Sequence, residues 1–175
     1  MQAFSRRGFQ LRTASVETRV AYTAFLVLTV LGLATLIALS VRVGITPNAI
    51  TTYYRGDDSE MSFGKTFWQL VEVSHFHLFS VPVVILILSH LLYGTPTSTR
   101  FRIWLTLITF AGALLESVGP FAVRYLASAF AYALIAGWLL LAAGAGLIVL
   151  VTLLSMWASE RWVRWFATPP EGQAS

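Results

Sequence analysis

The sequence predicts an all-α integral membrane protein, a bundle of four transmembrane helices with both termini on the cytoplasmic side. Of its 175 residues, 57% are hydrophobic and only 11% are charged, whereas soluble domains carry roughly 25% charged residues. The hydrophobic residues gather into four long runs, and a membrane-spanning helix needs about 20 predominantly apolar residues. We therefore expect a single membrane domain over residues 1–175.

The boundaries of the four runs define the expected helices. Arg19 and Arg42 enclose the first run. The second run is longer than a bilayer requires and contains Pro82, and a proline inside a helix favours a kink. Gly119 and Pro120 are expected to end the third run. The expected segments are a cytoplasmic arm over 1–19, helices over about 20–42, 67–93, 102–118 and 126–157, an external loop over 43–66 and a cytoplasmic tail over 158–175.

The arginine and lysine distribution predicts the orientation, because the cytoplasmic flanks of spanning helices are rich in both residues. Twelve such residues are split eight to four between the two expected sides: Arg6, Arg7, Arg12, Arg19, Arg100, Arg102, Arg161 and Arg164 against Arg42, Arg55, Lys65 and Arg124. We therefore expect a multi-pass protein of the bacterial inner membrane. These flanking arginines also explain the pI of about 9.9, so no nucleic-acid partner is expected.

Two compositional features narrow the chemistry and the packing. The chain has no cysteine, which excludes disulfides, zinc–thiolate sites, iron–sulfur clusters and covalent attachment of c-type haem. The fourth run has small residues four apart, at Ala133 and Gly137 and at Ala142 and Gly146. This spacing lets helices approach closely, and it predicts packing within the chain, with a subunit contact as the alternative.

All three histidines, His75, His77 and His90, lie in the second run together with Glu72. Ionisable side chains inside a membrane are costly, so they mark functional sites. At about 100° per residue, His75 and His90 lie about 60° apart around the helix and about 22 Å apart along it. His77 points away from His75. One side of the second helix would thus carry a histidine near each membrane face.

With this arrangement the second run resembles the haem-bearing helices of membrane b-type cytochromes, such as cytochrome b of bc-type complexes. The resemblance covers one helix of four and implies axial haem ligation by His75 or His77 near one face and by His90 near the other. Those cytochromes use two such helices, and this chain has one. The second ligands would come from a homodimer, from another membrane subunit, or from Met156 at the inner end of the fourth helix.

The leading hypothesis is therefore a membrane electron-transfer subunit that binds b-type haem and exchanges electrons with quinone and a partner protein. Such a chain would be a redox subunit of an oxidoreductase complex rather than an enzyme by itself. Glu72 and Glu116 are the candidates for proton handling at a quinone pocket. The alternative is a structural role, in which Glu72 and Glu116 face each other or Glu116 pairs with Arg124.

Two alternatives stay open. The first is a cofactor-free anchor or scaffold subunit whose polar side chains hold helices together. The second is a membrane protein that binds copper, iron or zinc through His75, His77 and His90. Its motif would be Glu72-x-x-His75 with His75-x-His77, and an oxygen from Glu72 or from Asp57, Asp58 or Glu60 of the external loop would complete the ligand set.

Overall fold

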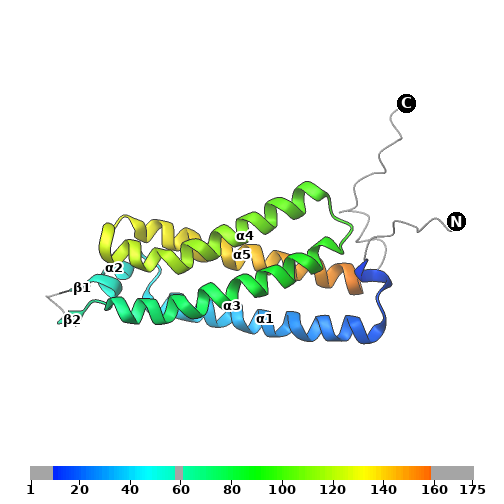
Figure 1. The fold of residues 1–175 in the computed structure, drawn as a ribbon, viewed down its shortest axis with the longest axis horizontal. Helices are drawn as coiled ribbons and strands as arrows, with labels where there is room; N and C mark the ends of the chain where they lie inside the picture. Colours follow the sequence, from blue (N-terminus) through cyan, green and yellow to red (C-terminus); the bar gives the residue numbers. More distant parts are fainter. Residues whose placement is uncertain (1–9, 58–60, 159–175) are drawn as a thin grey trace, which may run out of the picture.

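The fold is known from a computed structural model that describes residues 10–57 and 61–158. Its long helices run side by side, each antiparallel to the next along the chain (Figure 1). Each is long and apolar enough to cross a membrane, and they are α1 (Val16–Val43), α3 (Phe67–Tyr93), α4 (Thr99–Phe121) and α5 (Phe130–Trp157). The predicted four-span helical membrane fold is confirmed, and α1 begins at the end of the bundle where α5 finishes. Which membrane face that end occupies stays a prediction.

Polar caps set the starts of three spanning helices. Ser15 accepts a hydrogen bond from the backbone N–H of Thr18, so α1 begins four residues before the expected start at residue 20. Thr66 and Gln69 form a capping box at the start of α3. Ser98 accepts from the N–H of Phe101 at the start of α4. Such caps satisfy backbone donors that the first helical turn leaves unpaired.

The expected end of the third helix at residue 118 is wrong. α4 continues through Gly119 and Pro120 to Phe121, and a π-helical turn, η3 (Ala122–Leu126), extends it further. Pro120 costs the helix one backbone hydrogen bond. Gly119 lies so close to α5 that a Cβ there would be 2.9 Å from Leu134. Tight packing on α5 therefore holds the backbone helical where the local sequence favours a break. Residues 127–129 make the turn, so α5 starts at Phe130 rather than near 126.

The loop between α1 and α3 is folded and packs onto the bundle. It contains a short helix, α2 (Pro47–Arg55), and a pair of two-residue antiparallel strands, β1 (Gly56–Asp57) and β2 (Ser62–Phe63). Arg55 donates from Nε to the carbonyl of Val123, and Arg124 donates back to the carbonyl of Arg55. These two hydrogen bonds join α2 to η3. The strands are a minor addition to an otherwise helical fold.

At the opposite end, a 3₁₀ turn, η1 (Leu11–Thr13), closes the bundle. The backbone N–H of Leu11 donates to the carbonyl of Gly94, and the Leu11 side chain is fully buried. The residues just before α1 thus pack against the end of α3.

The core lies mainly between α4 and α5, where glycines let the two backbones approach. A Cβ on Gly112 would be 2.5 Å from the backbone nitrogen of Leu141, and one on Gly144 would overlap Thr109. Gly137 packs in the same way on Leu115. The predicted close packing within the chain is therefore confirmed for Gly137, whereas a methyl group at Gly146 would meet no atom within 4 Å.

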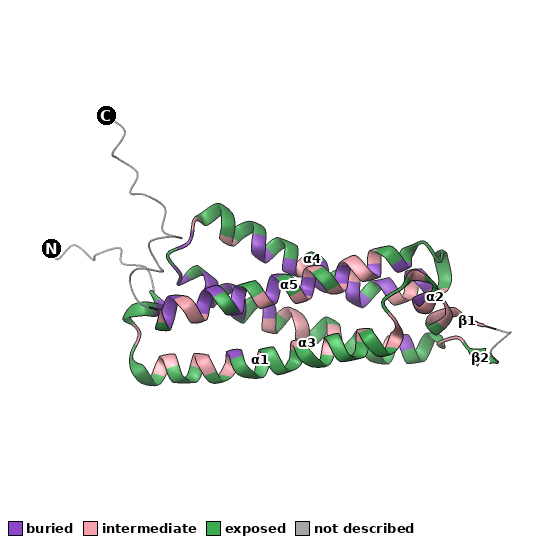
Figure 2. Ribbon diagram, turned by 180° about the vertical axis from the view of Figure 1, so that it is seen from behind, coloured by how far each residue is buried: buried purple, intermediate pink, exposed green. Residues whose placement is uncertain are grey.

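Burial is uneven around the bundle. Figure 2 shows buried residues along α4 and α5, while α1 is almost entirely exposed or half-buried. α1 packs chiefly on α5. Apolar side chains such as Leu28, Leu31 and Leu39 of α1 are more than half exposed, as expected for helices that face lipid.

Candidate functional site

An acid and a base meet inside the bundle. Nδ1 of His77 on α3 lies 2.8 Å from Oε1 and 2.9 Å from Oε2 of Glu116 on α4. Because an ionised carboxylate can only accept hydrogen bonds, the ring nitrogen is then the donor. The Glu116 side chain is 9% exposed and that of His77 is 32% exposed. The carboxylate is thus enclosed, while the imidazole reaches an open space.

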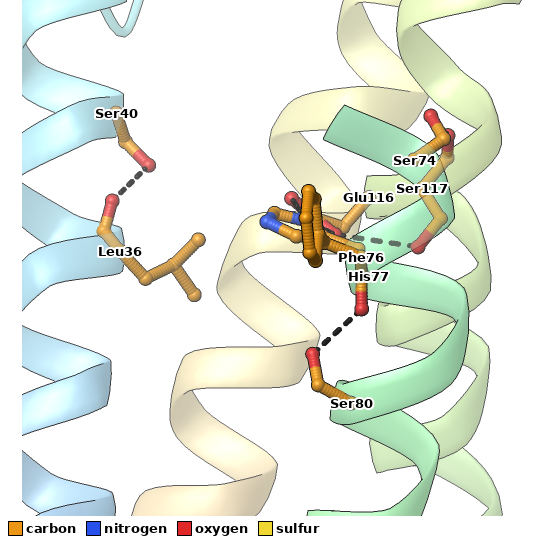
Figure 3. A network of polar contacts seen from close by, with 8 residues as sticks. All are labelled: Leu36, Ser40, Ser74, Phe76, His77, Ser80, Glu116 and Ser117. Atoms are coloured by element: carbon orange, nitrogen blue, oxygen red, sulfur yellow. Dashed lines mark hydrogen bonds and ion pairs between the residues drawn. The ribbon is translucent and has the colours of Figure 1, made fainter. Parts of the chain in front are cut away.

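Two neighbouring serines form hydrogen bonds that help to position the His77–Glu116 pair. Ser74 on α3 donates from Oγ to the backbone carbonyl of Ser117, which sets the register of α3 against α4. Ser117 donates to Oε2 of Glu116 at 3.4 Å. In Figure 3 the His77 and Glu116 side chains lie together, on the side of α3 that faces Leu36 of α1. Ser74 and His77, which are one helical turn apart on α3, therefore contact adjacent residues of α4.

The open space beside His77 is a cavity of about 430 Å³ between α1 and α3. Binding pockets for small molecules usually measure about 300 to 1,000 Å³. Leucines and other apolar residues make up most of the wall, and Leu141 and Ala145 of α5 form its floor. Leu28 and Leu39, which also line it, are more than half exposed, so the cavity opens toward the lipid side of the bundle.

The hydroxyl groups that line the cavity are already committed as donors. Thr29, Thr35 and Ser80 each donate to a carbonyl of their own helix. His77 is different, because Nδ1 faces Glu116 and no described residue forms a hydrogen bond with Nε2. A histidine oriented through one nitrogen by a carboxylate leaves its other nitrogen fixed for a ligand. His77 thus presents a fixed ring nitrogen at the cavity wall that a ligand can use.

The α2 end of the bundle contributes a half-buried phenol, that of Tyr54. Burial raises the pKa of Tyr54, and electrostatic repulsion from the neighbouring phenol of Tyr53, when ionised, and from Glu116 adds smaller contributions in the same direction. Tyr54 therefore stays a neutral hydroxyl at ordinary pH. It packs in a cluster with Ile50 of α2 and Val123 of η3.

The other predicted site residues lie elsewhere. Glu72, His75 and His90 are exposed on the outer side of α3, away from the cavity. The His75 ring packs against Phe79, with ring centroids 5.0 Å apart. Met156 is buried in the core with Leu88 and Leu92, which occupy the side of α3 opposite His90.

These placements bear on three sequence hypotheses. Glu116 pairs with His77, not with Glu72 or Arg124. Met156 and His90 do not converge within one chain. In the described ranges, no group of three or more histidine or acidic side chains is placed to hold a metal ion. Asp58 and Glu60 lie outside the described residues.

A family of transmembrane helical domains, Aq_1264_TM, matches residues 44–162. This match covers more than half of the chain. The chain belongs to this family. The family match includes both His77 and Glu116 but leaves out α1, which forms one wall of the cavity. No curated protein and no solved structure matches the chain.

Sequence reasoning did not anticipate the contribution of α1. Phe25, Gly32 and Leu36 line the cavity but read as ordinary members of an apolar run. Gly32 was the one indication in the sequence that this part of the helix has a special role. Glycine inside a helix is unfavourable by about 1 kcal/mol relative to alanine. In the structure, a methyl group there would meet no atom within 4 Å, so this glycine keeps the cavity wide.

Proposed function

We propose that the protein is a membrane redox subunit that binds a quinone or quinol in the cavity between α1 and α3. The observation that carries this proposal is the His77–Glu116 pair at the wall of an otherwise apolar, lipid-facing cavity. A membrane quinone has the same two parts, a ring with hydrogen-bonding oxygens and an apolar tail. The ring would lie against His77, and the tail would leave past Leu28 or Leu39.

The chemistry of the pair suits both ligand states. When the imidazole is protonated, Nε2–H donates to a quinone oxygen and Glu116 stabilises the positive charge. When it is neutral, with its proton on Nδ1, Nε2 accepts from a quinol hydroxyl. Reducing a quinone takes two electrons and two protons. His77 would pass protons, and a redox partner would supply the electrons.

We also retain the predicted orientation as part of this proposal. With the termini cytoplasmic in a bacterial inner membrane, the α2 end is external. His77 lies ten residues from the start of α3, about 15 Å along the helix. The pair would then lie within the hydrocarbon core, nearer its external side.

Filling the cavity tests the proposal. Gly32→Leu adds a side chain where a methyl group meets no atom within 4 Å, so the fold should tolerate it. We expect wild-type protein in lipid nanodiscs to bind about one short-chain quinone per chain and Gly32→Leu to weaken binding at least tenfold. Glu116→Gln should also weaken binding, because it removes the charge that supports a protonated His77. The measurement is equilibrium binding, with bound quinone extracted and quantified.

Gly146→Leu is the matched control. It is also a helical glycine with open space around its Cβ position, but it does not line the cavity. It should bind quinone as the wild type does. Equal binding by the wild type and Gly32→Leu would refute the cavity site. Absence of binding in all variants would leave the anchor or scaffold function as the better explanation.

Haem remains a second candidate, favoured by the exposure of both His75 and His90 on the same side of α3. Met156 is buried in the core with Leu88 and Leu92, on the side of α3 opposite His90, so a b-type haem there would take its second ligands from another subunit. If haem binds there, protein isolated with its native partners should show a b-type reduced-minus-oxidised spectrum. His90→Ala should lose part of that spectrum, whereas a flat wild-type spectrum would reject the haem hypothesis.

A further inference from the structure

The outer side of α3 carries a continuous stripe of exposed residues. Its members fall within a sector about 80° wide at 100° per residue. They are Trp68, Glu72, His75, Phe79, Val83, Leu86, His90 and Tyr93. We call this set the outer stripe. None of them lines the cavity, so it is a surface distinct from the candidate quinone site.

The depth of the outer stripe makes its polar members costly. Trp68 and Tyr93 are 76% and 47% exposed near the two ends of α3, where aromatic residues mark the membrane interfaces. Glu72 and His75 lie about 6 and 10 Å further along the helix from Trp68. Ionisable side chains at such depth almost always face protein or water rather than lipid. A protein surface is therefore needed to cover this stripe.

We propose that a second copy of this chain covers the outer stripe, with the two α3 helices packed about a two-fold axis normal to the membrane. Both copies have the same orientation in the bilayer, so a two-fold axis brings equal levels of α3 together. Glu72 and His75 are one helical turn apart. The stripe is thus self-complementary, because Glu72 of each copy lies beside His75 of the other.

Charge complementarity favours a second copy over a different subunit. The stripe carries an acid and a base one helical turn apart. A second copy of the same stripe can therefore pair both groups, and a different kind of subunit is not required. The reciprocal arrangement makes two acid–base contacts, and Phe79, Val83 and Leu86 pack between the copies below them. Unpaired ionisable groups would oppose any register without these contacts, so the pairing also selects one alignment.

Cysteine crosslinking tests the proposal directly, because the natural chain has no cysteine. Phe79→Cys and Val83→Cys replace residues at the middle of the outer stripe. Leu31→Cys on α1 and Leu139→Cys on α5 are controls of similar exposure, since the four native side chains are 69%, 55%, 58% and 65% exposed, respectively. The purified full-length chain would be reconstituted at a low protein-to-lipid ratio and treated with the lipid-soluble oxidant copper phenanthroline.

We expect most of the protein to form a disulfide-linked dimer at residue 79 or 83 and little to do so at residue 31 or 139. A disulfide requires Cα atoms within about 7 Å, so crosslinking reports direct α3–α3 packing. The absence of a dimer at both stripe positions, or equal dimer at all four positions, would overturn the proposal. Crosslinking only when other membrane proteins are present would show a different partner and would also overturn it.

A charge exchange tests the proposed contacts. Glu72→Gln in the Val83→Cys background should reduce the crosslinked fraction several-fold. The double exchange Glu72→His with His75→Glu preserves one acid and one base per copy and should restore it. Failure of the exchange to restore what the single change removes would reject the reciprocal pairing. Because Val83 does not line the cavity, quinone binding by Val83→Cys is an independent readout.

Discussion

Gly144→Leu is expected to cause one of the two largest losses of stability of any single substitution proposed for this protein. A Cβ at this position would overlap the side chain of Thr109 on α4, and a leucine would push α4 and α5 apart. Inserting atoms into a packed core costs about 1 to 3 kcal/mol and occasionally more. Because this contact joins the two most closely packed helices, we expect a cost of about 3 kcal/mol or more. Reversible unfolding in detergent would measure it.

Gly146→Leu again supplies the control, since it has the same chemistry two residues further along α5 with open space around the new atoms. Its unfolding free energy should stay within about 0.5 kcal/mol of the wild type. Equal effects at residues 144 and 146 would show that the α4–α5 contact does not depend on glycine at its centre.

His77→Leu should be the second strongly destabilising change. It leaves the Glu116 carboxylate buried without the base that pairs with it, and removing one member of a buried ion pair costs about 3 to 5 kcal/mol. Glu116→Leu should cost less, about 1 to 3 kcal/mol, because a neutral imidazole needs only one hydrogen-bond partner. The double variant His77→Leu with Glu116→Leu should recover most of the stability, since no charge remains to be compensated. The unfolding free energies of the wild type and of the three variants form a double-mutant cycle.

Ser80→Ala is the matched control for this cycle. Ser80 lines the same cavity but donates only to the Phe76 carbonyl of its own helix. Its loss should change stability by no more than about 0.5 kcal/mol. If the double variant were no more stable than His77→Leu, the pair would not be coupled in the folded protein. A stable double variant without quinone binding would show that the pair serves function at the expense of stability.

The three histidines of α3 lie on two different faces of this helix. His77 faces inward to Glu116 and the cavity, whereas His75 and His90 lie on the outer stripe. The two sets are separated by the width of the helix. A quinone site within each chain and an α3–α3 contact between chains are therefore compatible, and each has its own test.

The sequence by itself determined the class and the number of spans. Long apolar runs force helices in a membrane, because every backbone N–H and C=O must be paired within the segment. Thr66 and Gln69 mark the start of α3 locally, which is why the structure places that helix at Phe67–Tyr93, the range expected from sequence. The opposite directions of His75 and His77 follow from helical periodicity alone.

Only the tertiary structure decided which residues meet. The pairing of His77 with Glu116 depends on the register between α3 and α4, which the Ser74–Ser117 hydrogen bond helps set across 43 residues of sequence. The continuation of α4 past Pro120 depends on contact with Leu134, which outweighs a local preference for a break. The cavity exists because α1 packs on α5 and stands apart from α3 beside Gly32. Local sequence sets the conformation of each segment, but contacts between distant segments set the distances on which chemistry depends.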